Sequence, residues 1–253
     1  MNSQTRFNIT ASPRKLICQS PTSRAYYRRL SRYVAWLVLF FGSVALAWAQ
    51  GSPTTIYVSD TTIGDIFKFD AAGNRTVFAS GLNAPTGLAV DKAGNLYVAD
   101  AGTSSIYKYD PSGAMTVFSS GNYLNQPRGL AFDDTGVLYV ANANNNTIIK
   151  IDSAGNQTVF VGTQGSPLNV PFGLAFDRSG NLHVSSTNGN SIYKFDPFGN
   201  ATLFTNTALA GPTGVSFDAT GNLFVANVQS RRIQKFDPSG QGSVFVDNTG
   251  DYP

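Results

Sequence analysis

The sequence predicts an all-β protein built as a propeller, in which four-stranded antiparallel blades pack around a common axis. Three observations predict this fold class. A unit recurs along the chain with a period of ~40–45 residues, which is the period of a propeller blade. All 15 acidic residues are Asp, so Glu, a good helix former, is absent. The 25 Gly and 12 Pro residues indicate frequent turns.

The first 49 residues form a separate segment that we expect to be a signal peptide. A basic run that ends at Arg32 precedes the apolar residues 34–49, a stretch shorter than the ~20 residues of a membrane-spanning helix. It ends in Ala-Trp-Ala at residues 47–49, a small-residue cleavage site. The expected location is secreted or periplasmic, with no membrane contact after cleavage. The alternative is an uncleaved N-terminal helix that anchors the protein.

The repeating unit contains four short runs of β-branched and aromatic residues separated by polar turns, and each run is expected to be a strand. A unit begins with Pro-x-Gly-Leu-Ala-x-Asp, an almost wholly apolar run typical of a strand buried on both faces. Gly-Asn-Leu-Tyr-Val-Ala-Asp follows, then Ile-x-Lys-x-Asp, then a Gly turn that leads into Thr-Val-Phe. Four full copies start at Pro85, Pro127, Pro171 and Pro212, with spacings of 42, 44 and 41 residues. A Pro suits the start of the inner strand because no ladder donor is required there.

These copies divide the chain after the leader into five predicted blades. The predicted boundaries are 53–84, 85–126, 127–170, 171–211 and 212–252. The first range holds only the second, third and fourth strands of a blade, so we expect its first strand to be missing. Propellers of this kind usually complete the first blade with a strand from the C-terminus, and no such strand follows the fifth unit.

The pattern Pro-x-Gly-Leu-Ala-x-Asp-x-x-Gly-Asn-Leu-Tyr-Val-Ala-Asp, followed by Ile-x-Lys-x-Asp-Pro-x-Gly, resembles the NHL repeat. It is also similar to the repeats of gluconolactonase-like and virginiamycin B lyase-like propellers, which are typically six-bladed. The resemblance covers residues 53–253. It implies a six-bladed parent, of which this chain would be a truncated member with about five blades. Such folds host many functions, so the resemblance alone assigns no activity.

The charge distribution excludes nucleic acid as the expected partner. Residues 1–49 hold seven Lys or Arg and no acid, and subtracting these charges from the net charge of +3 leaves −4 for the remaining residues. A nucleic-acid-binding domain carries clustered Lys and Arg on its folded surface, whereas this body offers only the Arg231–Arg232 pair. The only cysteine, Cys18, lies in the leader, so the body has no disulfide and no cysteine metal site.

The variable loops form the predicted binding surface. The turns after the first and third strands of each unit are nearly identical between repeats and are expected on one face, here called the bottom face. The loops after the second strand and the connections between units vary, and are expected on the opposite, top face. We predict that this face binds a protein or carbohydrate; the alternative is that its loops are merely solvated. The predicted contact residues are Tyr123, Asn125, Gln126, Arg128, Asn144, Asn145, Asn146 and Phe172.

The metal ligands that the resemblance implies are absent from the sequence. In gluconolactonase-like propellers, Asn and Asp at the x of Pro-x-Gly and a Glu near the N-terminus hold a divalent metal in the central channel. Here the x positions hold Thr86, Arg128, Phe172 and Thr213, and there is no Glu. Calcium and magnesium prefer carboxylate and amide oxygens. We therefore predict no metal, no cofactor and no catalytic residue.

His183, the only histidine, is expected to be a packing residue. It occupies a column of aromatic side chains that also contains Tyr57, Tyr97, Tyr139 and Phe224. A lone His can act as a general base, and virginiamycin-lyase-like propellers use one. However, no Glu and no second His accompanies it, and a zinc site needs several such ligands.

Two columns of polar residues recur at the strand ends. The column that closes the second strand contains Asp60, Asp100, Asn142, Ser186 and Asn227. The column that follows the third strand contains Asp70, Asp110, Asp152, Asp196 and Asp237. The first column could bind a cation or sugar hydroxyls on the top face. We favour hydrogen bonding to the following turn, because the residue type changes to Ser while the spacing stays the same.

These observations predict an exported, non-catalytic binding module whose top face takes a protein or glycan ligand. The alternative from a different class is a metal-dependent lactonase or lyase with an incomplete site. A degenerate fragment without activity is the third possibility.

Overall fold

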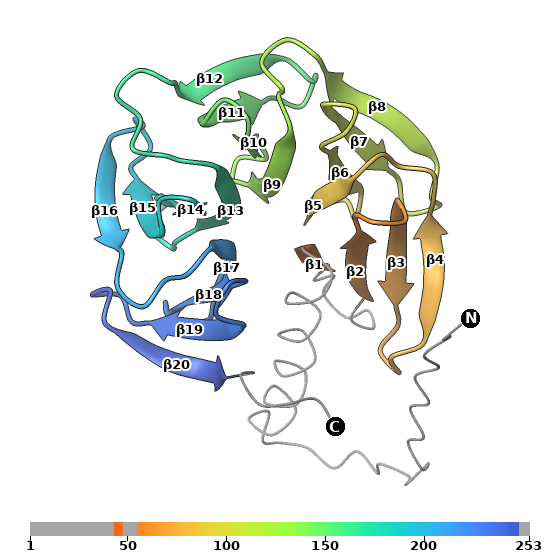
Figure 1. The fold of residues 1–253 in the computed structure, drawn as a ribbon. Helices are drawn as coiled ribbons and strands as arrows, with labels where there is room; N and C mark the ends of the chain where they lie inside the picture. The colour runs from red at the N-terminus through yellow and green to blue at the C-terminus, as the bar shows by residue number, and fades with distance from the viewer. Residues whose placement is uncertain (1–42, 48–54, 248–253) are drawn as a thin grey trace, which may run out of the picture.

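The computed structural model describes residues 43–47 and 55–247, and its regular elements are all β-strands. They form five sheets of four antiparallel strands each, arranged around a common centre (Figure 1). The predicted all-β propeller of about five blades is therefore confirmed. Within the described ranges there is no helix that is long and apolar enough to cross a membrane.

Each blade takes four consecutive strands of the chain. Blade 1 contains β1 (Ser43–Ala47), β2 (Thr55–Asp60), β3 (Asp65–Phe69) and β4 (Arg75–Ala79). Blade 2 contains β5 (Pro85–Val90), β6 (Leu96–Asp100), β7 (Ser105–Tyr109) and β8 (Met115–Ser120). Blade 3 contains β9 (Pro127–Phe132), β10 (Leu138–Asn142), β11 (Thr147–Ile151) and β12 (Gln157–Val161). Blade 4 contains β13 (Pro171–Phe176), β14 (Leu182–Ser186), β15 (Ser191–Phe195) and β16 (Ala201–Thr205). Blade 5 contains β17 (Pro212–Phe217), β18 (Leu223–Asn227), β19 (Arg232–Phe236) and β20 (Gly242–Asp247).

The turns of the bottom face are held by an Asp at their first position. In the turn after β5, Asp91 Oδ1 accepts the N–H groups of Ala93 (2.9 Å) and Asn95 (2.8 Å), and Oδ2 accepts the Asn95 amide (2.7 Å). Gly94 has a φ of +85°, which a glycine adopts without steric cost. The same arrangement recurs after β3, where hydrogen bonds from Asn74 lower the pKa of Asp70. The Asp columns of these turns are therefore structural.

The inner strands approach one another so closely that the Gly of Pro-x-Gly has no room for a side chain. A Cβ at Gly87 would lie 1.9 Å from the Arg128 carbonyl oxygen, and one at Gly129 would lie 1.9 Å from that of Phe172. At Gly173 the corresponding distance to the Thr213 carbonyl oxygen is 2.2 Å. The repeated Gly thus allows successive blades to converge on one axis.

Aromatic side chains fill the junctions between blades. Tyr139 of β10 packs edge-on against Phe160 of its own blade (5.1 Å between ring centroids) and against Phe176 of blade 4 (4.9 Å). Tyr97 makes the equivalent contacts with Phe118 and Phe132. We call such a set of three rings a junction triad. It explains the Tyr of the aromatic column in blades 2 and 3, because each of these blades buries its Tyr against the next blade.

Blade 5 has only two rings of this set among the described residues. Phe224 packs edge-on against Phe245 with a centroid separation of 4.8 Å, and no described blade follows to supply the third ring. Phe245 is 42% exposed, whereas its counterpart Phe160 is half-buried. Burial of the outer aromatic residue thus depends on the next blade.

Blade 1 differs from the prediction that its first strand is missing. The structure places Ser43–Ala47 as β1, antiparallel to β2, with Ser43 opposite Ser59 and Ala47 opposite Thr55. β1 also packs against β5, as β5 packs against β9. The sequence assigns these residues to the apolar part of the expected signal peptide, and a short apolar run is equally consistent with a buried strand. Because cleavage after Ala49 would separate β1 from β2, that cleavage and the complete blade 1 exclude one another.

Removal of β1 is expected to destabilise the protein. A chain that starts at Gln50 would leave one edge of β2 unpaired and one side of β5 uncovered. We expect its free energy of unfolding to be lower by about 3 kcal/mol or more than that of a chain starting at Phe40. Urea unfolding followed by circular dichroism measures the difference. Equal stability of the two chains would contradict the assignment of Ser43–Ala47 to blade 1.

Candidate functional site

Two variable loops lie side by side on the top face. Residues 121–126 connect blades 2 and 3, and residues 143–146 join β10 to β11. The Ala143 N–H donates to the Gln126 carbonyl (3.1 Å), and the Asn144 side-chain amide donates to Asn125 Oδ1 (3.0 Å). Asn144 is exposed and Asn125 is half-buried, so this pair presents amide groups to solvent.

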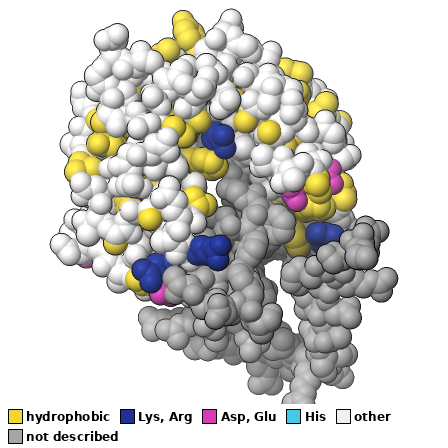
Figure 2. All heavy atoms as spheres, viewed as in Figure 1, with side chains coloured by type: hydrophobic (Ala, Val, Ile, Leu, Met, Phe, Trp, Pro, Cys, Tyr) yellow, Lys and Arg dark blue, Asp and Glu magenta, His cyan; other side chains and the backbone are white. Residues whose placement is uncertain are grey.

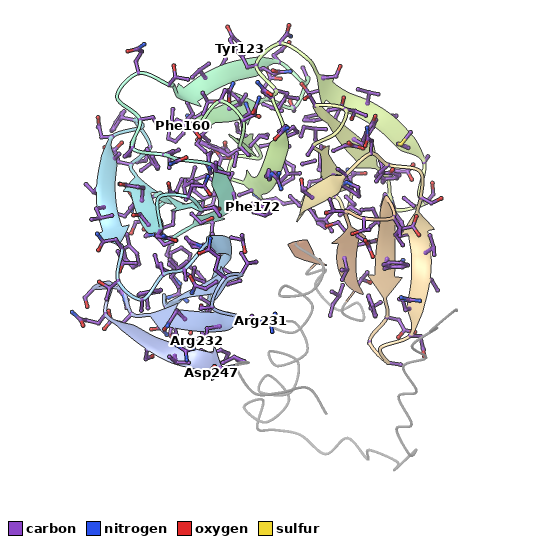
Figure 3. All side chains as sticks on the ribbon, viewed as in Figure 1. Tyr123, Phe160, Phe172, Arg231, Arg232 and Asp247 are labelled. Carbon is purple, nitrogen blue, oxygen red and sulfur yellow. The ribbon has the colours of Figure 1, made fainter. Side chains whose placement is uncertain are left out.

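Arg128 and Phe172 lie at the inner edge of the ring, on the neighbouring strands β9 and β13. The guanidinium carbon of Arg128 is 5.4 Å from the centroid of the Phe172 ring. Figure 3 places Phe172 at the ring centre, and Figure 2 shows a basic side chain among hydrophobic ones at the same place. Both side chains are half-buried. Arg128 Nε is buried without a hydrogen-bond partner, and burial lowers the pKa of the guanidinium.

The equivalent threonines are occupied by structural hydrogen bonds. Thr86 and Thr213 are 3% and 9% exposed. The Thr86 hydroxyl donates to the carbonyls of Ala99 (3.2 Å) and Pro127 (3.0 Å), and the Thr213 hydroxyl donates to that of Ala226 (3.3 Å). Of the four x positions of Pro-x-Gly, only those of Arg128 and Phe172 present a side chain to a ligand.

Asn145 and Asn146, two of the predicted contact residues, shape the loops. Asn145 Oδ1 accepts the Thr147 hydroxyl (2.8 Å), and Asn146 Oδ1 accepts the Val170 N–H (2.7 Å). Asn146 has a φ of +58°, a left-handed conformation that Asn tolerates better than most residues. Gln126, with a φ of +49°, has an exposed side chain and remains available as a contact residue.

Tyr123 lies apart from the inner pair. It is 52% exposed, and its N–H donates to Gln157 Oε1 on the outer strand β12 (2.9 Å). Figure 3 places it at the outer edge of the ring, away from Phe172. The eight predicted residues are therefore not one cluster. They divide into the inner pair Arg128 and Phe172, a polar group around Asn125 and Asn144, and the outer Tyr123.

The column that closes the second strand is structural, as the favoured interpretation predicts. Asp100, which is 1% exposed, accepts the N–H of Thr103 in the following turn (3.1 Å) and that of Asn83 in the preceding connection (2.7 Å). Asn142 and Ser186 likewise accept N–H groups from the connections that precede their blades. The column thus fixes both top-face segments of a blade. Sequence reasoning identified the following turn and missed the connection, which is distant in sequence.

A cavity of about 520 Å³ on the bottom face was not predicted. It lies between blades 3 and 4, with Tyr139, Phe160 and Phe176 among its lining residues and the turn residues Asp133 and Asp177 beside them. Near-identical turn sequences gave no signal for it, because it forms only where two blades meet. Among the residues with described positions, no three His, Cys, Asp or Glu side chains are grouped to hold a metal ion.

His183 replaces the tyrosine of a junction triad. Its ring packs edge-on against Phe204 (4.8 Å) and Phe217 (4.9 Å), and the side chain is 3% exposed. Burial lowers the pKa of His183, and the contact with Asp177 only partly opposes this shift. The 3.4 Å contact from Nε2 to Asp177 Oδ2 is therefore a hydrogen bond from a neutral ring, with Nδ1 buried and unpartnered. His183 is the packing residue that the sequence predicts.

The free energy of unfolding is expected to decrease as the pH is lowered, because of His183. Its pKa in the folded protein is lower than the unfolded value of about 6.5. Below that pH the unfolded state therefore binds a proton at His183 more readily than the folded state does. The stabilisation that the neutral His183 side chain provides at higher pH is then lost. Urea unfolding at about pH 8 and about pH 5 should show the decrease, and His183→Tyr should remove it. A decrease that persists in His183→Tyr would contradict this origin.

The fold and the top face define a class of protein, a β-propeller of NHL-type repeats with variable loops on one face. Two family models match the sequence. The SMP-30/gluconolactonase/LRE-like region matches residues 40–120, and the NHL repeat matches residues 124–151. These matches cover part of the chain and agree with its β-propeller fold. The first match begins before β1, in agreement with a blade 1 that includes Ser43–Ala47. No curated protein sequence matches the chain.

Solved structures share the fold at low sequence identity. Virginiamycin B lyase from Staphylococcus aureus has a TM-score of 0.65 and 17% identity, with 83% of this chain and 71% of that one covered. A gluconolactonase from Xanthomonas campestris has a TM-score of 0.70 and 19% identity, with coverages of 84% and 79%. A chain of a nidogen–laminin complex has a TM-score of 0.70 and 20% identity, with coverages of 80% and 78%.

Proposed function

We propose that the chain is a non-catalytic binding module whose top face binds a protein partner. The observation that carries this proposal is the hydrogen bond between Asn144 and Asn125, which joins two variable loops of the top face into one exposed polar surface. Binding residues are commonly displayed on loops over a rigid scaffold. The closely packed inner strands supply that scaffold.

The composition of the top-face loops as a whole, including the outer Tyr123, favours a protein over a carbohydrate ligand. Exposed Tyr123 offers a large amphipathic contact area, and the Asn and Gly residues around it offer adaptable hydrogen bonding, as in antibody binding loops. Arg and Tyr are also enriched among the residues that dominate protein–protein affinity. A propeller of similar fold occurs in a complex of nidogen and laminin, so the architecture is compatible with this use.

Capture with matched variants tests the proposal. Arg128→Met combined with Asn144→Ala changes the top face, and Arg178→Met combined with Ser179→Ala makes a similar change on the bottom face. We expect a partner captured by the unaltered protein to bind the top-face variant at least about tenfold more weakly and the bottom-face variant equally well. Equal binding to both variants would contradict the proposal. Loss of binding after enzymatic removal of glycans would identify a carbohydrate ligand instead.

We also propose that the protein is exported, on the basis of the basic and apolar pattern before residue 50. Of the two expected forms, the one with an uncleaved N-terminus keeps β1 joined to β2. N-terminal sequencing of the protein isolated from its host distinguishes them. A mature chain beginning at Gln50 would support cleavage and would require blade 1 to form without a covalently attached β1.

A metal-dependent lactonase or lyase is the second candidate, because the family match and two of the structural neighbours point to such enzymes. Elemental analysis of the purified chain separates the two candidates. Calcium, magnesium or zinc retained at one ion per chain would favour the enzyme. The proposed binding module is expected to retain less than about a tenth of that amount.

A further inference from the structure

We propose that Arg128 and Phe172 form a subsite for a carboxylate, which an acidic side chain of the protein partner supplies. The inference rests on the proposed function, because it names the chemistry by which the top face recognises its partner. It concerns the junction between the inner strands β9 and β13 of blades 3 and 4.

The other inner junctions are bridged by hydroxyl groups. These bonds run from Ser59 to the Thr86 carbonyl (2.7 Å), from Thr86 to the Pro127 carbonyl (3.0 Å) and from Ser185 to the Thr213 carbonyl (2.6 Å). At the junction of blades 3 and 4, the described residues show the contact of Arg128 with Phe172 instead. Neutral hydroxyl groups bridge the same ring elsewhere, so ring closure does not require a cation here.

The charge of Arg128 has no counter-ion among the described residues. The ion-pair contacts there join Arg232 to Asp247 and His183 to Asp177. A half-buried guanidinium without a carboxylate is unfavourable, because burial removes part of its hydration and nothing replaces it. The contact with the Phe172 ring, at 5.4 Å from the guanidinium carbon, compensates only part of this loss. An arriving anion would therefore find a cation that is already partly desolvated and held in place.

The geometry suits a carboxylate. A guanidinium presents its N–H donors in one plane, and they match the two oxygens of a carboxylate. The guanidinium carbon lies 5.4 Å from the Phe172 centroid, and Nε has no hydrogen-bond partner, so an N–H donor is left for a ligand. Phosphorylated ligands are usually bound by clusters of Arg, whereas Arg128 is the single cation of the inner pair. One positive charge therefore favours a ligand group with one negative charge.

Selection of peptides from a displayed library of random sequences tests the inference on the full-length protein. We expect the selected peptides to share an Asp or Glu whose replacement by Asn or Gln weakens binding by about 30-fold or more. The Arg128→Met protein should bind the acidic peptide more weakly by a similar factor. It should also bind the acidic peptide and the amide peptide equally well. Arg231→Met, which removes an exposed cation from the same face, is the matched control and should change binding less than about threefold.

The possible results separate this inference from the proposed function. In one result, peptides bind more weakly to the Asn144→Ala or Tyr123→Ala protein, but their affinity changes neither with Arg128→Met nor with replacement of their own acidic residue by an amide. This result would overturn the carboxylate subsite and leave the top face as the binding surface. Peptides that are insensitive to all of these changes would overturn both. The ligand-free Arg128→Met protein should unfold at the same temperature as the unaltered protein or at a higher one, since it loses a half-buried charge that has no counter-ion among the described residues. A lower midpoint would show that Arg128 serves stability and would contradict the inference.

Discussion

Replacement of Gly129 by Ala is expected to lower the free energy of unfolding by about 4 kcal/mol or more, or to prevent folding. The added Cβ would lie 1.9 Å from the carbonyl oxygen of Phe172, which belongs to the inner strand of the next blade. Neither backbone can move without separating blades 3 and 4. Urea unfolding followed by intrinsic fluorescence measures the effect.

Gly162→Ala is the matched control for Gly129→Ala. Gly162 lies between blades 3 and 4, and a Cβ there would meet only a Val159 methyl group at 3.7 Å. We expect this variant to be as stable as the unaltered protein or up to about 1 kcal/mol more stable, because Ala restricts the unfolded chain. If Gly129→Ala is as well tolerated as Gly162→Ala, the inner strands do not converge as described.

Replacement of Tyr139 by Ala is expected to cost about 3–5 kcal/mol. The ring is 5% exposed and lies between Phe160 of its own blade and Phe176 of the next, so its loss leaves a void in a junction triad. Lys150 also lies over the ring, with its ammonium 5.1 Å from the centroid. The free energy of unfolding in urea measures the loss.

Two further variants show whether the loss arises from the junction. Phe245→Ala removes an aromatic residue from blade 5, where the triad lacks its third ring among the described residues, and should cost less than half as much as Tyr139→Ala. Tyr123→Ala removes an exposed ring of the top face and should change stability by no more than about 0.5 kcal/mol. Similar losses in all three variants would contradict a special role of the blade junctions.

The repeat made most of the fold predictable from the sequence. The inner-strand Gly, the bottom-turn Asp and the aromatic column each recur with fixed spacing, and the structure shows the contact that maintains each of them. His183 illustrates the strength of this reasoning, because its column alone predicted that it packs like a Tyr.

β1 was missed for a physical reason. Residues 43–47 form an apolar run, and such a run is compatible with a signal peptide and with a buried strand alike. The distinguishing information is the pairing of β1 with β2 and its packing on β5. Those contacts depend on the three-dimensional arrangement and have no local signature in the sequence.

The candidate site was predictable as a face and only partly as a set of residues. Asn145 and Asn146 looked like contact residues because their loop varies, yet their side chains hold the loop and the next connection in place. The contact of Arg128 with Phe172 joins residues from different blades, and the absence of a counter-ion is visible only in three dimensions. Sequence variation therefore indicated where to look but not which side chains are free to bind.

Blocking one face at a time tests the central claim, that the chain binds its partner through the top face. On a Cys18→Ser background, Asn144→Cys places one thiol on the top face and Ala154→Cys places one in the exposed turn after β11. Each protein is coupled to a bulky maleimide polymer, and binding of the captured partner is measured before and after coupling. We predict that coupling at position 144 abolishes binding and that coupling at position 154 leaves it unchanged. The reverse pattern, or equal binding after both couplings, would contradict the claim.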